Sequence, residues 1–192
     1  ILITGSYGLA MEVPPIFTEK GYWQQKEVSL EHIDVRPGNN AVLVIAGSCS
    51  AMTQKQNDYA VGHGFFPLKL DVLQLLDNNN AKKEEIQRMV DDAVRALHRE
   101  KHVLLYSTVS QQLLKDMYKK TADMGWSTYR LGLITAKALA LITETILDSS
   151  LVNKLIIAGG ETAGHLCNTL DLAALQVGKQ IDPGVPLCFS MG

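Results

Sequence analysis

The chain has 192 residues, of which 46% are hydrophobic and 20% charged, a composition typical of a folded globular protein. Its formal net charge of -2 excludes a strong overall attraction to nucleic acid or anionic membranes, so any bound anion must be held by local groups. Three widely spaced cysteines argue against a disulfide framework, and no apolar run approaches the ~20 residues of a membrane span. We therefore expect a cytoplasmic protein with no membrane or nucleic-acid partner.

The first predicted elements are a strand at 1–4 and a helix from about Leu9 to Glu19. The chain opens inside an apolar strand pattern, without an initiator methionine. We therefore expect it to be part of a longer protein.

Short apolar runs then alternate with longer helical patterns. Such alternation predicts an α/β fold with a mostly parallel sheet flanked by helices on both faces, a Rossmann-like three-layer arrangement. The predicted strands are 41–47, 65–71, 102–107 and 154–159, followed by two closing strands at 173–178 and 186–192. The predicted helices are 51–62, 82–100, 110–123, about 132–148, and a last one reaching about Leu170.

The helix at 82–100 has the clearest amphipathic pattern. We expect its acidic side chains to form a solvated face. Its predicted apolar face consists of Ile86, Met89, Val90, Ala93, Val94 and Leu97.

Polar and glycine-rich loops follow three predicted strands, at 46–56, 106–112 and 158–165, and a weaker one lies at 4–8. In parallel sheets the ligand crevice lies at the carboxyl ends of the strands. These loops are therefore the candidate binding segments.

Two of the loops suit an anion. The first N–H groups of a helix have no partner within it, and a preceding glycine lets phosphate oxygens approach the backbone. The segments 47–48 and 159–162 have this character. Neither contains the phosphate-binding or dinucleotide-binding glycine motif, so a tight turn without a ligand stays equally open. Glu161 would repel phosphate. Its default role is capping the helix, and the alternatives are binding a ribose hydroxyl or orienting water around Mg²⁺.

Other chemically reactive side chains are better explained by structure. His165 and Cys49 lack partners at catalytic spacing, which favours packing roles. Asp71 and Asp182 lie in loops, where turn formation is the more common role of aspartate. Either aspartate could also meet a metal, whereas His63, His98 and His102 form no metal-ligand spacing with one another or with the cysteines, so no metal ligand is assigned.

Three stretches together resemble a known family. "VLVIAGSCSAMTQKQ" (42–56), "LIIAGGETAGHL" (155–166) and "LQVGKQIDPGVP" (175–186) resemble the C-terminal nucleotide-binding domain of the four-carbon acid sugar kinases. Gly132 resembles a glycine at a helix start in that family. Ala163 departs from it, since a serine is frequent at that position.

The resemblance implies a transfer of phosphate from ATP, with Mg²⁺, to a hydroxyl of a sugar acid such as a threonate, an erythronate or an oxo-tetronate. It implies that residues 1–192 are the C-terminal domain of a two-domain kinase. The sugar acid and the catalytic carboxylate would come from the enzyme's own N-terminal domain, with its "DDLTGA"-like motif. That motif is absent from these residues, so this chain alone would be inactive and hold no catalytic residue. A homodimer is a possible assembly. The implied ATP-binding residues are Gly47, Ser48, Gly132, Gly159, Gly160, Glu161 and Thr162.

Two alternatives remain at this point. One is a non-catalytic or regulatory module of the same fold, favoured by Ala163 and the missing N-terminal half. The other is a nicotinamide-dependent oxidoreductase, which rests on the α/β pattern alone and lacks the usual glycine fingerprint.

Overall fold

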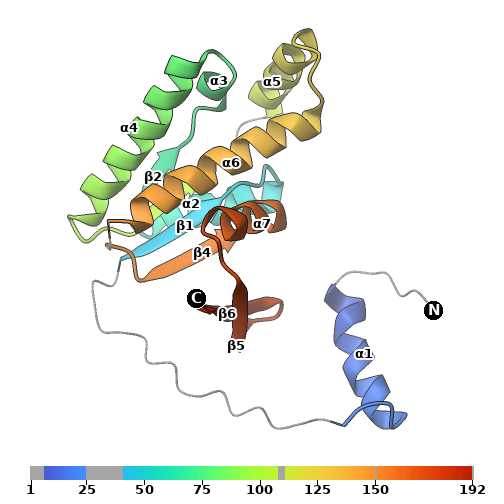
Figure 1. Cartoon of the computed structure of the whole chain (residues 1–192). Helices are drawn as coiled ribbons and strands as arrows, with labels where there is room; N and C mark the ends of the chain where they lie inside the picture. The colour runs from blue at the N-terminus through green and yellow to red at the C-terminus, as the bar shows by residue number, and fades with distance from the viewer. Residues whose placement is uncertain (1–6, 25–40, 108–110, 150, 192) are drawn as a thin grey trace. The chain divides into compact units, whose positions relative to one another are not determined.

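The computed structural model describes residues 7–24, 41–107, 111–149 and 151–191 (Figure 1). The chain divides into two compact units, Arg36–Leu172 and the combination of Ile1–Val35 with Ala173–Gly192. Among the described helices, none combines the length and apolar character needed to cross a membrane. In chain order the elements are α1 (Tyr7–Glu19), β1 (Val42–Ala46), α2 (Ala51–Gly62), β2 (Phe66–Lys69), α3 (Val72–Leu75), α4 (Asn79–Leu97), β3 (Val103–Tyr106), α5 (Gln111–Asp123), α6 (Thr128–Leu147), β4 (Lys154–Ala158), α7 (Gly160–Thr169), β5 (Ala174–Asp182) and β6 (Val185–Met191).

The larger unit is built on a four-stranded sheet in the order β2-β3-β1-β4. All three neighbouring pairs are parallel, and Leu43 of β1 lies opposite Val103 of β3 and Leu155 of β4. Because β1 lies between two neighbours, its apolar run is paired along both sides. The predicted parallel α/β sheet is confirmed.

Helices cover both faces of this sheet. From β1 the chain crosses β3 to reach β2, and it then turns back toward β3 and β4. Since parallel crossovers are almost always right-handed, this reversal places α2 on one face and the later helices α4 and α6 on the other. Leu43 and Ile45 are fully buried in a core that includes Met89 of α4 and Leu139 of α6. Leu104 alternates to the opposite face of β3 and is also fully buried.

Most predicted elements are found within a few residues of their expected bounds. The helix at 51–62 matches α2, whereas the predicted strand 1–4 lies outside the described residues. Helix α6 begins at Thr128, four residues before its predicted start, because the Ser127 hydroxyl accepts the N–H of Arg130 and caps the helix. β2 ends at Lys69, since Asp71 caps α3 instead of extending the strand.

The two closing strands do not join the sheet. β5 and β6 pair with each other in an antiparallel two-stranded sheet of their own. The turn between them, Pro183-Gly184, lets adjacent strands pair locally, and Gly184 adopts a φ of 79° that favours glycine. A hairpin is therefore the outcome that the short connection selects.

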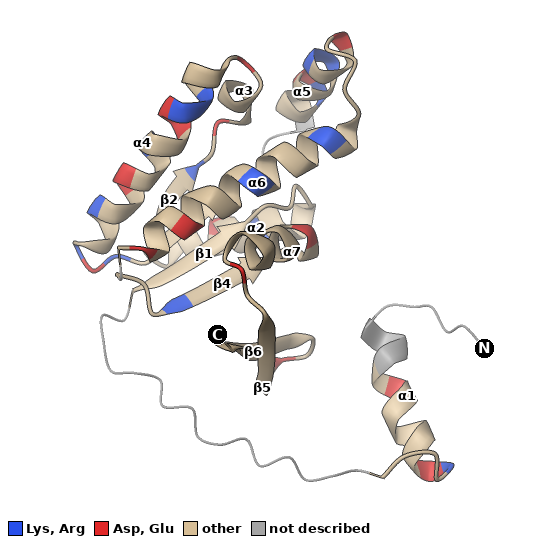
Figure 2. Ribbon diagram, viewed as in Figure 1, with Lys and Arg blue, Asp and Glu red and all other residues tan. Residues whose placement is uncertain are grey.

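Helix α4 confirms its predicted apolar face, with Met89, Val90, Ala93 and Leu97 buried. The expectation that all its acids are solvated is wrong for Glu85, which is only 6% exposed. Its carboxylate accepts hydrogen bonds from Arg88 and from the backbone N–H of Asp71, both at 2.7 Å. The hydrogen bond from Arg88 to Glu85 raises the pKa of the Arg88 guanidinium, despite an opposing effect of burial. Figure 2 shows acidic and basic residues of both signs along α4. Glu85 thus ties α4 to the loop after β2.

Candidate functional site at the carboxyl ends of β1 and β4

The loops after β1 and β4 lie side by side. The two strands are direct neighbours, and Ala46 at the end of β1 pairs with Ala158 at the end of β4. A Cβ atom placed on Gly159 would lie 4.0 Å from the Cβ of Ser48. The expected convergence of these two loops is therefore observed.

Gly47 and Thr162 form the tightest contact between the loops. A Cβ atom on Gly47 would lie 2.2 Å from the Thr162 Oγ1, a distance that no real pair of atoms tolerates. Thr162 is only 4% exposed. The absence of a side chain at Gly47 therefore lets α7 pack against the end of β1.

Ser107 supports the same loop from the other side of β1. Its backbone N–H donates to the Ala46 carbonyl at 3.2 Å, and its hydroxyl donates to the Gly47 carbonyl at 3.3 Å. Ser107 is 2% exposed, so it fixes the position of the loop from within the protein. Sequence reasoning selected its loop but missed this residue, although it is the first hydroxyl after β3.

The amino end of α7 is open. Gly159 precedes it with φ 117° and ψ 124°, and no side chain caps the helix. The first helical bond runs from the Ala163 N–H to the Gly159 carbonyl at 2.9 Å. A Cβ atom on Gly160 would meet nothing within 4 Å. Gly159, Gly160 and Glu161 are exposed, so the uncapped amino end of α7 lies at the surface, a geometry that suits phosphate oxygens.

The amino end of α2 is closed by its own hydroxyl groups. The Ser50 hydroxyl accepts the N–H of Thr53 at 3.1 Å and lies 2.9 Å from the Thr53 hydroxyl. Ser48, before it, accepts the Ser50 N–H at 3.2 Å. An anion would therefore have to displace existing bonds at α2 but not at α7.

Glu161 links this site to α6. A Cβ atom on Gly132, in the second turn of α6, would lie 3.7 Å from each carboxylate oxygen of Glu161. Within the described part of the chain, no hydrogen bond or ion pair to the Glu161 side chain is found, so the capping role expected as its default is not observed. The structure thus gathers all the residues singled out from the sequence, namely Gly47, Ser48, Gly132, Gly159, Gly160, Glu161 and Thr162.

The other candidates contribute to structure. Cys49 is half-buried against the core, and the Asp71 carboxylate accepts the Leu73 N–H at 3.0 Å as a helix cap. Tyr106 ends β3 at the same edge of the sheet. Burial raises the pKa of its phenol, and the nearby negative charge of Asp58 adds to the increase.

Sequence comparisons find a matching family and similar kinases. Residues 43–192 match the family described as "Nucleotide-binding C-terminal domain". The chain is 31% identical to a 3-oxo-tetronate kinase of Pseudomonas fluorescens over 193 residues, which cover all of this chain and 40% of that protein. It is 25% identical to a D-threonate kinase of Salmonella typhimurium, over 76% of this chain and 34% of that protein. The chain therefore spans well under half the length of these relatives.

A solved structure supports the same relationship. A Haemophilus influenzae protein superposes with a TM-score of 0.65 at 27% identity, covering 79% of this chain and 34% of its own. Residues 43–192, which match the family, include both loops of the site and the β5–β6 hairpin. The chain therefore belongs to the family of nucleotide-binding C-terminal domains found in the four-carbon acid sugar kinases, as the three sequence stretches had predicted.

Proposed function

We propose that this chain is the ATP-binding half of a two-domain kinase that phosphorylates a hydroxyl of a four-carbon sugar acid. The observation that carries the proposal is the uncapped amino end of α7, set beside the loop after β1. The names of the 3-oxo-tetronate and D-threonate kinases supply the substrate class. The sugar acid and the catalytic carboxylate would come from an N-terminal domain.

The role of the α7 loop in this proposal is to hold the polyphosphate. Backbone N–H groups of Gly160 and Glu161 would donate to phosphate oxygens, and the positive end of the helix dipole would favour the negative charge. Phosphoryl transfer depends mainly on positioning and on stabilising charge, so a rigid backbone cradle is a suitable contribution. Ser107 and Thr162 would act through the loops by holding them in place.

The charge of Glu161 fits the proposal only with a cation. A carboxylate at the first turn of α7 would repel a polyphosphate bound there. A bound Mg²⁺ would supply the positive charge that makes carboxylate and phosphate compatible, and Mg²⁺ in kinases is commonly held in this way. Glu161 is the residue positioned to hold it, directly or through water, because its side chain has no other described partner.

The experiment is a calorimetric titration of the chain with a non-hydrolysable ATP analogue, with and without Mg²⁺. Two glycines of α7 form a matched pair for it, since a Cβ atom on either Gly160 or Gly164 would meet nothing within 4 Å. We expect Gly160→Ala to weaken binding by about ten-fold, which corresponds to ~1.4 kcal/mol, because the methyl group occupies the space of a phosphate oxygen. Gly164→Ala should leave the affinity unchanged.

Absence of binding to the wild-type chain, or equal affinities for the two alanine variants, would contradict the nucleotide site. The substrate class is tested separately, by incubating the full-length protein with ATP and a panel of four-carbon sugar acids. If nucleotide binds but no acid in the panel is phosphorylated, the remaining function is a nucleotide-binding module without this activity. Ala163, where a hydroxyl is frequent in the family, is the feature that favours that second candidate.

A further inference from the structure

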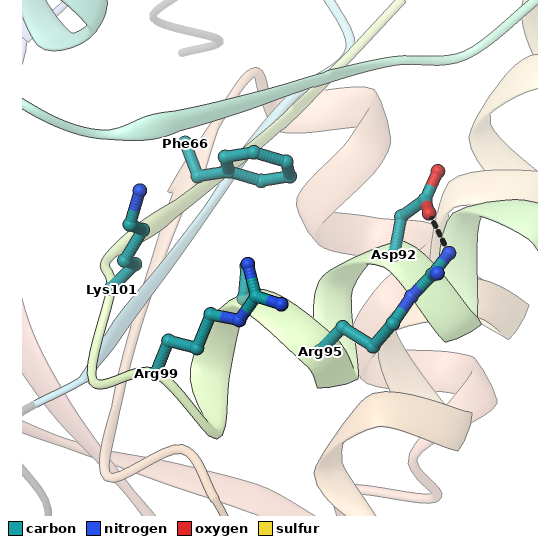
Figure 3. A pocket seen from close by; sticks show the side chains of 6 residues that line it. Phe66, Asp92, Arg95, Arg99 and Lys101 are labelled. Atoms are coloured by element: carbon teal, nitrogen blue, oxygen red, sulfur yellow. Dashed lines mark hydrogen bonds and ion pairs between the residues drawn. The ribbon is translucent and has the colours of Figure 1, made fainter.

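A pocket lies near the amino ends of the strands, opposite the candidate site at their carboxyl ends. It has a volume of about 240 Å³ and is lined by the first residue of β2, by the last turns of α4 and by the connection between α4 and β3. Because β1, β2 and β3 are parallel, their amino ends are remote from the loops that follow the strands. The lining residues are Phe66, Asp92, Arg95, Ala96, Arg99 and Lys101 (Figure 3).

Positive charge exceeds negative charge in this pocket. Three cationic side chains face a single carboxylate, that of Asp92. Asp92 is already shared, since it pairs with Arg88 at 3.2 Å and also with Arg95. In the described part of the chain, the Arg99 and Lys101 side chains have no hydrogen bond or ion pair, which leaves their charges uncompensated.

Helix electrostatics accounts for part of this arrangement only. Cations near the carboxyl end of a helix are favoured by its dipole, and Arg95 in the last turn of α4 fits that explanation. Arg99 and Lys101 lie beyond the last helical residue, Leu97. Glu100 between them adopts a φ of 56°, a left-handed conformation that is unfavourable for a residue with a side chain. This conformation belongs to the turn that ends α4, in which the Lys101 N–H donates to the Ala96 carbonyl at 3.2 Å and the Glu100 N–H donates to the Leu97 carbonyl at 2.9 Å. The same turn sets Arg99 and Lys101 on the pocket.

Phe66 gives the pocket an apolar wall. The Lys101 Nζ lies 5.8 Å from the centre of its ring, a favourable position for an ammonium group over an aromatic face. Figure 3 shows the Arg99 and Lys101 side chains on the side of the pocket that Phe66 borders, whereas Arg95 turns toward Asp92. A ligand between them would meet two positive groups and one flat apolar surface.

We propose that this pocket binds a small phosphate monoester, with the phosphate held by Arg99 and Lys101 and the organic group packed against Phe66. Guanidinium and ammonium groups together match the several oxygens of a phosphate dianion. The volume suits a small ligand and is below the range of about 300–1,000 Å³ typical of drug-sized ligands. The site is separate from the α7 loop and does not depend on the proposed kinase activity.

The test uses the whole 192-residue chain labelled with ¹⁵N, observed by NMR during titration with phenyl phosphate. We expect saturable shifts of the Arg95 and Arg99 Nε–H signals, while Arg130, whose guanidinium stacks 4.0 Å over Trp126, serves as an internal reference. Titration with sodium chloride at equal ionic strength separates specific binding from screening. Inorganic phosphate tests the role of the apolar wall, and we expect it to bind more weakly than the phenyl ester.

The double variant Arg99→Gln/Lys101→Gln should weaken phenyl phosphate binding by about ten-fold or more, because it removes both uncompensated charges. The double variant Lys115→Gln/Lys119→Gln removes two exposed charges from α5 and should leave binding unchanged. All four of these side chains are exposed, so folding should not be affected. Gly160→Ala should also have no effect, which separates this pocket from the nucleotide site.

Three results would overturn the proposal. They are a lack of saturable shifts at Arg95 and Arg99, equal affinity of the wild type and the Arg99→Gln/Lys101→Gln variant, and shifts that sodium chloride reproduces. Binding of a long polyanion such as heparin without binding of phenyl phosphate would likewise exclude a small-ligand pocket and indicate a surface for an acidic macromolecule.

Discussion

Two helices start beside each other at the carboxyl edge of the sheet, yet they treat their first N–H groups in opposite ways. At α2 the Ser50 hydroxyl accepts the Thr53 N–H, so the helix end is satisfied from within the protein. At α7 the preceding residue is Gly159, which has no side chain to offer. Both follow an apolar strand that ends in Ala-Gly, so the strand pattern alone does not distinguish them. A missing cap, and not the strand pattern, therefore distinguishes the helix end at which we propose that an anion binds.

The loops before α2 and α7 meet at the contact between Gly47 and Thr162. Gly47→Ala would place a methyl group 2.2 Å from the Thr162 hydroxyl oxygen, so the loops must separate. We expect the free energy of unfolding to fall by about 1–3 kcal/mol, as for other overpacked sites. Urea denaturation followed by circular dichroism measures this loss.

Thr162→Ala provides the control, since it removes the clashing oxygen. The double variant Gly47→Ala/Thr162→Ala should recover part of the stability lost in Gly47→Ala. If the two substitutions are instead additive, Gly47 and Thr162 are not in contact and the two loops do not meet as described.

Removing the cap of α2 tests whether the amino end of this helix also binds the nucleotide. Ser50→Ala leaves the Thr53 N–H without its acceptor, and we expect a loss of about 1 kcal/mol in the free energy of unfolding. The affinity for an ATP analogue should stay the same, because the proposed site is at α7. A clear fall in affinity, with unchanged stability, would show that α2 also holds the nucleotide.

Glu161→Gln tests the charge at the open helix end. Without Mg²⁺ the substitution removes a repulsion of about 1 kcal/mol, so the ATP analogue should bind more tightly, by roughly five-fold. With Mg²⁺ the same substitution should weaken binding, because a cation ligand is lost. Calorimetry in magnesium and in chelator gives both values. An effect of the same sign in both conditions would exclude a role of Glu161 in holding the cation.

The fold was predictable because periodicity and burial agree along most of the chain. Leu43 and Ile45 lie in an unbroken apolar run, and the sheet buries both of them completely. Both closing strands were predicted but their pairing was not, since strand patterns do not specify which strands pair when a two-residue turn offers a local partner.

The site was predictable in its residues but not in their separate roles. Gly47 and Gly160 look alike in the sequence, yet their surroundings differ. A side chain on Gly47 would collide with Thr162, whereas a side chain on Gly160 would contact nothing. Glu85 escaped prediction because its partner in the preceding segment, the Asp71 N–H, is a backbone group that carries no sequence signal. Periodicity and motif spacing do not reveal roles that depend on tertiary contacts of this kind.

The smallest expected effect concerns Tyr106, at the end of the strand next to β1. Burial and the charge of Asp58 raise its pKa above the ordinary value of 10.0, so the folded protein retains the phenol proton after an unfolded chain has lost it. The stability from this group is complete below the unfolded pKa and is lost as the pH rises through the folded one. Wild type should therefore lose more stability than Tyr106→Phe above about pH 10.

Ultraviolet absorbance of tyrosinate measures this titration directly. The difference between wild type and Tyr106→Phe isolates one phenol among the six tyrosines of the chain. Asp58→Asn should lower the Tyr106 pKa only part of the way, because burial is the larger cause. If Tyr106 titrates like a free tyrosine, water reaches the end of β3, and the edge of the sheet beside the β1 loop is more open than its packing indicates.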